Sequence, residues 1–284
     1  MSPEATARSV LLGGDGPPGG RDDLERAFFA GLRLPNGVFK TTWTQRLQDL
    51  NEALARHLPE GGSLELMDVA VSSGVSTAEW AESLSALGRD HHLVAGDLTM
   101  SADLVGLPGG VDVLLTRSGA LLQVDVRGRR RLTTESTLAR RLTRAVIGLW
   151  CRALVGSPRL ARSSGASCVR VPLLSARVAA RTDIEWIDDD ILGRPDPGLA
   201  GRFHAVRAAN ILNLGYFPAP VLITGLRNLR TRLRPGGVLA VVRTDGDANH
   251  GSILRLDESG SFTVLDRVGD GSEVEGLALS LAPD

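Results

Sequence analysis

The stretch over residues 63–87 constrains the fold more than any other part of the chain. An apolar run at 63–71 is followed by a turn of small residues at 72–74 and by helical spacing of apolar residues over 76–87. A strand, a tight loop and a helix in this order begin a βαβ unit. A second short apolar run at 92–95 then predicts the next buried strand of that unit.

The same alternation continues toward the carboxyl terminus. Further apolar runs predict strands, a helix is predicted over 220–233, and the tail predicts an antiparallel hairpin followed by an extended piece. Strands that alternate with helices favour a doubly wound, mostly parallel sheet, and an antiparallel edge on such a sheet is common. We therefore expect an α/β fold with a seven-stranded sheet and an antiparallel C-terminal hairpin. The predicted later strands lie at 184–187, 203–209, 238–243, 252–256 and 262–268, and the extended piece at 274–281.

The domain organisation follows from where periodic segments start. Residues 1–20 are rich in glycine, proline and small residues, which predicts a disordered lead-in. Residues 21–60 carry two helical patterns, and residues 61–284 are expected to form the main domain with an insertion at 100–182. That insertion is too long for an ordinary crossover connection. It should hold a hairpin over 111–126 and an amphipathic helix over 137–155, which we expect to act as a basic cap segment.

Positive charge is concentrated in one segment. Residues 127–181 contain thirteen arginines and a single acid, Glu135, whereas the whole chain has a formal net charge of -1. The basic segment either packs against the acidic remainder or binds an anionic substrate, a lipid surface or nucleic acid. We regard nucleic acid as the weakest of these partners. The helix over 137–155 is too short and too interrupted by arginine to span a bilayer, but a basic amphipathic helix can lie on a membrane surface.

The two cysteines and the amino terminus indicate the compartment. Cys151 and Cys168 have neither a CxxC spacing nor a Cys/His cluster nearby, so we expect no disulfide framework and no metal site. Residues 1–21 lack the basic start and apolar run of a signal peptide. A cytoplasmic protein is the expectation, and the oligomeric state stays open.

The loop after the first strand is the candidate binding site. In doubly wound folds ligands bind outside the carboxyl ends of the strands, where small side chains let the backbone approach them. Small residues recur at Ala70, Ser72 and Gly74, at every second position after Asp68. Asp97 ends the second strand, where a carboxylate can accept hydrogen bonds from ribose hydroxyls. A complete GxGxxG dinucleotide fingerprint is absent.

Four segments in this order resemble class I S-adenosylmethionine-dependent methyltransferases. They are Met-Asp-Val-Ala-Val-Ser-Ser-Gly at 67–74, Val-Ala-Gly-Asp-Leu at 94–98, Asp-Asp-Ile at 189–191 and Leu-Arg-Pro-Gly-Gly-Val-Leu at 233–239. The resemblance covers most of residues 60–245. The chain departs from the family where Ala70 and Ser72 replace glycines of the first motif. It also departs at 244–251, which is too short for the helix usual between the fifth and sixth strands.

The resemblance implies S-adenosylmethionine as the cofactor and methyl transfer to a small-molecule or amphiphilic acceptor. The positive charge of the basic segment is compatible with an anionic acceptor. The implied adenine contact lies at the end of the third strand, where we favour Asp190 among three consecutive aspartates and expect Ile191 to pack on the ring. The acceptor and the methylated atom do not follow from the family. The expected cofactor-binding residues are Asp68, Ala70, Ser72, Gly74, Thr77, Asp97, Leu98, Asp190, Ile191 and Asn210.

The candidates for the methyl-transfer step are a base and two residues that could orient an acceptor. If the acceptor is an alcohol or a phenol, His204 or His250 could act as the base, since imidazole titrates near neutral pH. His204 also fits a structural histidine in a buried strand. Asn213 and Tyr216 follow that strand and either orient an acceptor or cap a loop.

Two other functions stay open on the sequence alone. A nicotinamide-dependent oxidoreductase, using NAD or NADP, shares the Rossmann-type fold but would lack the third fingerprint glycine. A non-catalytic binding protein with a degenerate cofactor loop is consistent with Ala70 and Ser72. Such a protein would fill the cofactor cleft with its own side chains.

Overall fold

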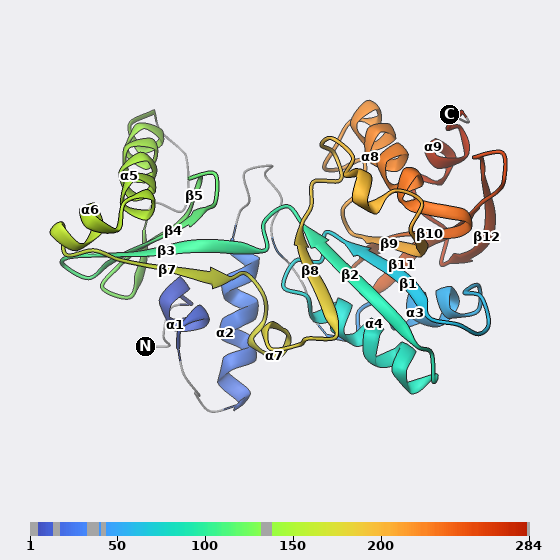
Figure 1. Ribbon diagram of the computed structural model, residues 1–284, viewed down its shortest axis with the longest axis horizontal. Coiled ribbons are helices and arrows are strands. Elements are labelled where there is room, and N and C mark those ends of the chain that lie inside the picture. Colours follow the sequence, from blue (N-terminus) through green and yellow to red (C-terminus); the bar gives the residue numbers. More distant parts are fainter. Residues whose placement is uncertain (1–4, 14–17, 33–39, 41–43, 132–137, 283–284) are drawn as a thin grey trace. The chain divides into compact units, whose positions relative to one another are not determined.

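The computed structural model describes residues 5–13, 18–32, 40, 44–131 and 138–282, and all structural statements below concern these residues. The chain forms two compact units, each assembled from two separate stretches (Figure 1). Met1–Thr42 and Thr99–Ala179 make the first, which we call the antiparallel unit. Trp43–Leu98 and Ala180–Asp284 make the second, the parallel unit.

The parallel unit contains a seven-stranded sheet in the order β12-β11-β10-β9-β1-β2-β8. The five strands from β10 to β8 are parallel, and β11 and β12 add an antiparallel hairpin at one edge. This confirms the expected mixed sheet and its C-terminal hairpin. The strands are β1 (Leu64–Val69), β2 (His91–Asp97), β8 (Ile184–Asp188), β9 (Phe203–Ala209), β10 (Leu233–Asp245), β11 (Ala248–Leu256) and β12 (Phe262–Val268).

Helices cover both faces of this sheet. The helices α3 (Gln48–Ala55) and α4 (Val75–Ala86) lie on one face, and α8 (Ala219–Arg232) and α9 (Glu275–Leu279) lie on the other (Figure 1). Helix α4 leads from β1 to β2 and α8 leads from β9 to β10, in opposite directions across the sheet. Right-handed crossovers in opposite directions place their helices on opposite faces. The central strands are therefore buried on both sides, as their unbroken apolar runs predict.

The tail of the chain differs from the prediction at one point. Strand β10 turns directly into β11 through Gly246, whose φ is 58°, and Asp245 pairs with Ala248 across the turn. No helix separates these two strands, as the short 244–251 stretch led us to expect. The last predicted element, an extended piece over 274–281, is wrong: those residues contain helix α9, and Ala278 is buried.

The antiparallel unit has a five-stranded sheet in the order β6-β5-β4-β3-β7. One face packs on α1 (Ala7–Leu11) and α2 (Pro18–Ala30), and the other on α5 (Leu138–Gly156) and α6 (Pro158–Ser163). Alternate strand residues supply the two cores: Leu104 and Leu114 face α2, whereas Val105 and Val113 face α5. The strands are β3 (Ser101–Leu107), β4 (Val111–Thr116), β5 (Leu121–Val126), β6 (Arg129–Arg131) and β7 (Ser167–Pro172).

Two expectations need correction here. The predicted lead-in contains helix α1, and Ala7 and Val10 are buried in the core of the antiparallel unit; residues 1–4 and 14–17 of that lead-in lie outside the described part of the chain. The insertion is not a simple cap segment, because it forms a five-stranded sheet with α5 and α6 on one face, while α1 and α2 from the N-terminal stretch cover the other. The predicted hairpin is confirmed by the pairing of β4 with β5. Two short elements complete the description, α7 (Ala176–Ala179) and the 3-10 turn η1 (Pro197–Leu199).

Helix α5 carries an apolar stripe that faces outward. Leu142, Val146 and Leu149 are 60%, 67% and 74% exposed, and Trp150 is 47% exposed. The opposite face of the helix is buried through Cys151 and Leu154. No helix among the described residues is long and apolar enough to cross a membrane.

Candidate functional site

The loop that follows β1 has an unusual backbone. Ala70, Ser72 and Gly74 all have positive φ angles, of 57°, 58° and 80°. Glycine reaches this left-handed region freely, whereas a residue with a Cβ pays roughly 1–2 kcal/mol. Two of the three positions carry a side chain, so the surrounding structure must hold the loop in this shape. Such strain is concentrated at functional sites in proteins generally.

Asp97 holds the loop from the neighbouring strand. Its Oδ2 accepts a hydrogen bond of 2.7 Å from the backbone N–H of Ser72, and the carboxylate is buried at 5% exposure. The N–H of Val71 also donates to the carbonyl of Gly96 at 3.2 Å. The strained loop is thus fixed to the end of β2, beside the residue expected to bind a ribose.

The carboxylate of Asp68, by contrast, is hydrogen-bonded to other buried side chains of the protein. It accepts two hydrogen bonds from the guanidinium of Arg207, at 3.0 and 2.6 Å, and a third from the hydroxyl of Thr77 at 2.7 Å. Asp68 is 2% exposed and Arg207 is fully buried. Asp68 thus binds Arg207 and Thr77, and the hydroxyl of Thr77 binds Asp68. We therefore correct the assignment of Asp68 and Thr77 as cofactor-binding side chains.

Arg207 is the residue at this edge that the sequence analysis missed. Its guanidinium also donates to Asn51 Oδ1 at 2.5 Å and to the carbonyl of Ser76 at 3.0 Å, and it lies 4.5 Å from the centre of the Trp80 ring. Burial lowers the pKa of the nearby Arg46, and the charge of Arg207 lowers it further. The signal was present in the sequence: a single arginine inside an apolar strand needs a buried acid as its partner.

The end of β8 contributes a row of aspartates. Asp188 is the Cα partner of Asp97, so it lies beside it at the carboxyl end of the sheet. Asp189 is withdrawn from solvent by two hydrogen bonds from Arg232, at 2.6 and 2.9 Å. Asp190 is exposed and accepts the N–H of Leu192 at 3.0 Å. Of the three aspartates, Asp188 and Asp190 are therefore on the surface at this edge.

Ile191 is placed by helix α8. Its side chain is 6% exposed, and its carbonyl accepts a hydrogen bond of 2.9 Å from Asn228. Leu98, which directly follows β2, is half-buried. An adenine ring could contact only the small part of the Ile191 side chain that α8 leaves exposed. The role of Ile191 in binding adenine stays a prediction.

The residues after β9 mostly stabilise loops. Asn210, with φ 59°, donates to the hydroxyl of Thr244 and accepts its N–H at 2.7 Å, which ties the ends of β9 and β10 together. Asn213 Oδ1 accepts the N–H of Tyr216 at 3.0 Å and so caps a turn. The Tyr216 side chain is 55% exposed and stacks edge-on against Phe217. Tyr216 is thus the one of these three residues whose polar group is presented at the surface.

His204 lies at the wrong end of the sheet to act as a base at this site. It is the second residue of β9 and accepts the N–H of Glu65, the second residue of β1, at 2.9 Å. The candidate loop follows the last residue of β1, so the length of the strand separates the two. We correct the assignment of His204 as a catalytic base.

The structure gathers most of the predicted cofactor residues at one edge. Each follows or ends a parallel strand, and the carboxyl ends of parallel strands meet at the same edge of the sheet. Their role in binding stays a prediction. The residues brought together in this way are Ala70, Ser72, Gly74, Asp97, Leu98, Asp190, Ile191 and Asn210.

The chemistry of this edge fits S-adenosylmethionine in part. The small side chains of the loop allow close approach, and the acids Asp97, Asp188 and Asp190 suit a ligand with hydroxyl groups and positive charge. Asp68 does not fit the role of a cofactor contact, because three hydrogen bonds within the protein already engage its carboxylate. The fit therefore rests on the loop and on Asp97.

Comparisons with known proteins return distant likenesses only. No protein-family model and no curated protein match the sequence. Among solved structures, the chain is similar to the CMeT domain of the citrinin polyketide synthase (17% identity, 80% of this chain and 40% of that chain, TM-score 0.37). It is also similar to the N-methyltransferase NodS from Bradyrhizobium japonicum WM9 in complex with S-adenosyl-L-homocysteine (15% identity, 70% and 62%, TM-score 0.32). A third is the [4+2]-cyclase SpnF (16% identity, 72% and 47%, TM-score 0.32). The chain thus spans between 40% and 62% of the length of these three structures.

Proposed function

We propose that the carboxyl edge of the parallel sheet binds S-adenosylmethionine and that the protein is a methyltransferase. The observation that carries this proposal is the loop at residues 70–74, held in a left-handed conformation by the hydrogen bond from Ser72 to Asp97. A strained loop with small side chains at the end of the first strand is what close approach of a nucleotide-type ligand requires. The order of the four family-like segments selects S-adenosylmethionine among such ligands.

The chain would contribute binding and positioning. The bound cofactor supplies an electrophilic methyl group on a positively charged sulfur. Asp97, together with the exposed Asp188 and Asp190, makes this edge acidic, which favours a cationic ligand. The remaining task of the protein is to hold an acceptor atom in line with the methyl group and to exclude water. Tyr216 follows β9 and is exposed, which supports a role in contacting an acceptor.

The acceptor class we propose is amphiphilic, and it depends on the proposed methyl transfer. Helix α5 exposes Leu142, Val146, Leu149 and Trp150, and residues 138–163 contain no acid and six arginines. An apolar stripe within a basic surface matches an anionic lipid surface. Flotation with vesicles containing phosphatidylserine should retain the protein at low salt and release it at high salt. Retention that is equal on neutral phosphatidylcholine vesicles, or absent on both, would reject this acceptor class.

Calorimetric titration with S-adenosylmethionine and S-adenosylhomocysteine tests the cofactor assignment. We expect both to bind the wild type, and we expect Asp97→Asn to weaken binding about tenfold or more, the effect of losing a charged hydrogen-bond acceptor. Asparagine keeps an oxygen for the Ser72 N–H, so the loop should stay in place. The matched control is Asp90→Asn, which removes an exposed aspartate that precedes β2 at the other edge of the sheet. If neither compound binds the folded wild type, the methyltransferase proposal fails.

A non-catalytic binding protein is the second candidate. The buried ion pair of Asp68 with Arg207 favours it, because the protein fills with its own side chain a place that the sequence suggested for a ligand. This alternative predicts a well-folded chain that binds neither S-adenosylmethionine nor its product. The same titration therefore separates the two functions.

A further inference from the structure

A pocket lies at the opposite edge of the same sheet, where the parallel strands begin. It has a volume of about 340 Å³ and is lined by two histidines, two arginines and a proline-glycine turn. His57 follows α3, His204 lies near the start of β9, Arg234 near the start of β10, and Arg255 on β11. Its volume is at the lower end of the roughly 300–1,000 Å³ of ordinary ligand pockets.

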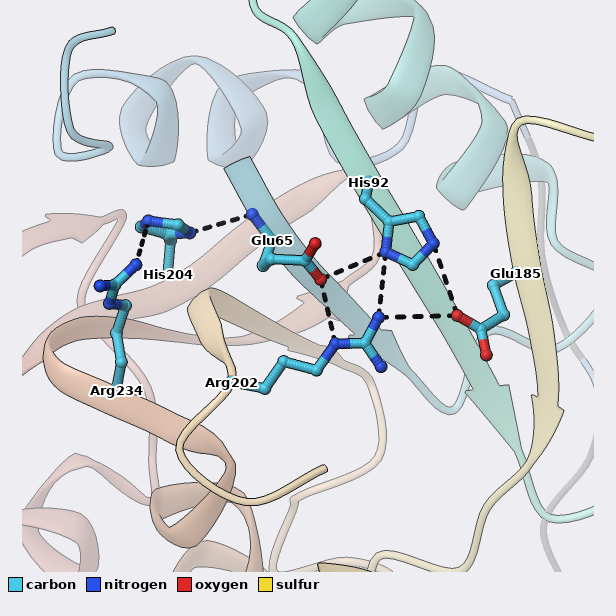
Figure 2. Close-up of polar contacts among 6 residues, drawn as sticks. All are labelled: Glu65, His92, Glu185, Arg202, His204 and Arg234. Carbon is cyan, nitrogen blue, oxygen red and sulfur yellow. Dashed lines mark hydrogen bonds and ion pairs between the residues drawn. The ribbon is translucent and has the colours of Figure 1, made fainter. Parts of the chain in front are cut away.

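The described residues that line this pocket include no acid. Two acidic residues contact its lining. Asp266 lies 3.4 Å from Nε2 of His57 and pairs with Arg56 at 3.0 Å. The Glu65 carboxylate accepts a hydrogen bond from Arg202 at 3.0 Å and contacts His92 at 3.2 Å (Figure 2). Figure 2 shows the Glu65 carboxylate on the side of its strand facing His92, while its backbone nitrogen faces His204. The positive charge of the lining therefore comes from Arg234 and Arg255, whereas His57 is paired with Asp266.

His204 and Arg234 present two hydrogen-bond donors to each other. The N–H of Glu65 donates to His204 Nδ1 at 2.9 Å, so in the neutral ring the hydrogen is on Nε2. Arg234 Nη1 lies 2.5 Å from that same Nε2 (Figure 2). A guanidinium can only donate, so no acceptor stands between these two groups. An oxygen of an anion that separated the two groups would accept from both.

The backbone beside Arg234 is shaped to form a wall of the pocket. Strand β10 pairs with β9 at Leu233 and again from Val238, and the register shifts between these points. Residues 234–237 therefore bulge out of the sheet. Gly236 has φ 77°, and a Cβ placed on it would meet nothing within 4 Å, so its open side faces free space. Such a bulge re-aims the side chain of Arg234 toward the pocket.

We propose that this pocket binds the phosphate group of a small phosphorylated molecule. The two arginines supply fixed positive charge, and His204 Nε2 supplies a directed donor, the combination that recognises a phosphate oxygen. The volume leaves room for a body attached to the phosphate. The site is independent of the proposed cofactor loop, because the length of the parallel strands lies between them.

Titration calorimetry with pyrophosphate and with inorganic phosphate, at constant ionic strength, tests the proposal. We expect the wild type to bind pyrophosphate in the millimolar range or tighter, and Arg234→Gln and Arg255→Gln each to weaken binding about tenfold, as for one lost charge-assisted hydrogen bond. Both arginines are exposed, so their replacement should leave the melting temperature unchanged. The matched control is Arg194→Gln, an exposed arginine of the same unit outside the pocket, which should bind as the wild type does.

A second measurement follows the histidine itself. In ¹⁵N spectra of the imidazole, His204 should show the hydrogen on Nε2, and pyrophosphate should shift the Nε2 signal in the wild type, and in Arg234→Gln only at about tenfold higher concentration. Two results would overturn the proposal. One is no binding of pyrophosphate up to about 10 mM, a concentration that detects even millimolar affinity. The other is an equal loss of binding in Arg194→Gln and Arg234→Gln, which would mean general attraction to a basic surface.

Discussion

The two edges of the parallel sheet hold charge in opposite ways. At the carboxyl edge the acids Asp97, Asp188 and Asp190 gather, and two arginines are buried in ion pairs there, Arg207 with Asp68 and Arg232 with Asp189. At the amino edge arginines and histidines gather, and their ion pairs are partly exposed: Arg202 is 30% and Glu65 37% exposed. The difference shows that one sheet can present an acidic and a basic site without any change of fold.

The direction of the helices gives a physical reason for this division. Helices α4 and α8 follow β1 and β9, so their amino-terminal ends point to the carboxyl edge and their carboxyl-terminal ends to the amino edge. The helix dipole favours acids at the first end and bases at the second. The last turn of α8 carries Arg230 and Arg232 accordingly. The dipoles alone would favour an anionic ligand at the carboxyl edge and a cationic ligand at the amino edge, so the ligands proposed for the two edges depend on the side chains and not on the helix ends.

The largest expected effect comes from breaking the buried pair of the carboxyl edge. Arg207→Met should lower the free energy of unfolding by about 3–5 kcal/mol, because the Asp68 carboxylate stays buried without its partner. Chemical denaturation monitored by circular dichroism measures the loss. A second change, Asp68→Leu in the same chain, should restore part of the stability by removing the orphaned charge.

Arg202→Met at the amino edge is the matched comparison. Its ion pairs with Glu65 and Glu185 are partly exposed, so its loss should cost no more than about 1 kcal/mol. Equal losses in Arg202→Met and Arg207→Met would contradict the distinction between a buried and an exposed charge network.

The pH dependence of stability should report on the amino edge. Burial lowers the pKa of His204 below its ordinary value, and the neighbouring Arg234 charge lowers it further. A base whose pKa falls on folding binds fewer protons in the folded state than in the unfolded state. The free energy of unfolding is therefore highest above the ordinary histidine pKa, where the ring is neutral in both states, and decreases as the pH falls below that value. Unfolding curves between pH 7.5 and 5.5 should therefore be less pH-dependent for His204→Gln than for the wild type, by about 1 kcal/mol at most. An unchanged pH dependence would contradict a pKa of His204 that is lowered on folding.

The smallest expected effect concerns the strained loop of the carboxyl edge. Ala70→Gly and Ser72→Gly relieve roughly 1–2 kcal/mol of left-handed strain but add about 0.4–1 kcal/mol of entropy to the unfolded chain. We expect each to stabilise the protein by a few tenths to about 1 kcal/mol. Ala70→Val should destabilise it, since a β-branched residue adopts this backbone least well. Thermal melts of the three variants measure the order, and a stabilising Ala70→Val would refute the strain.

The parallel sheet could be predicted because each of its strands is marked by residues that are adjacent in the sequence. Each strand is a short apolar run, and small residues mark the turn after β1, so periodicity alone places them. Strands β3 and β7 of the antiparallel unit were not predicted. Gly106 interrupts the first, and Cys168, Val169 and Arg170 of the second are exposed, so neither has the apolar signature of a buried strand.

The sequence could predict that the candidate site lies at the carboxyl edge of the parallel sheet, but not which side chains contact one another there. The sequence placed Ala70, Ser72 and Asp97 together because strand ends align in a parallel sheet. It could not reveal that Arg207, 139 positions away in the chain, binds Asp68. Partner choice between distant residues is a tertiary property, and the same limit hid the pocket around His204 and Arg234.

The way the chain passes between the two units also governs how it can be made. It leaves the antiparallel unit after residue 42, returns at 99 and leaves again at 179. Phe28 and Leu32 on or after α2 can find their core partners Leu104 and Val171 only once those residues have been synthesised. At translation rates of roughly 5–20 residues per second, these apolar side chains wait for on the order of ten seconds on the ribosome. Neither unit can finish folding before the other has begun, so nascent chains of this protein should depend on holding chaperones through most of their synthesis.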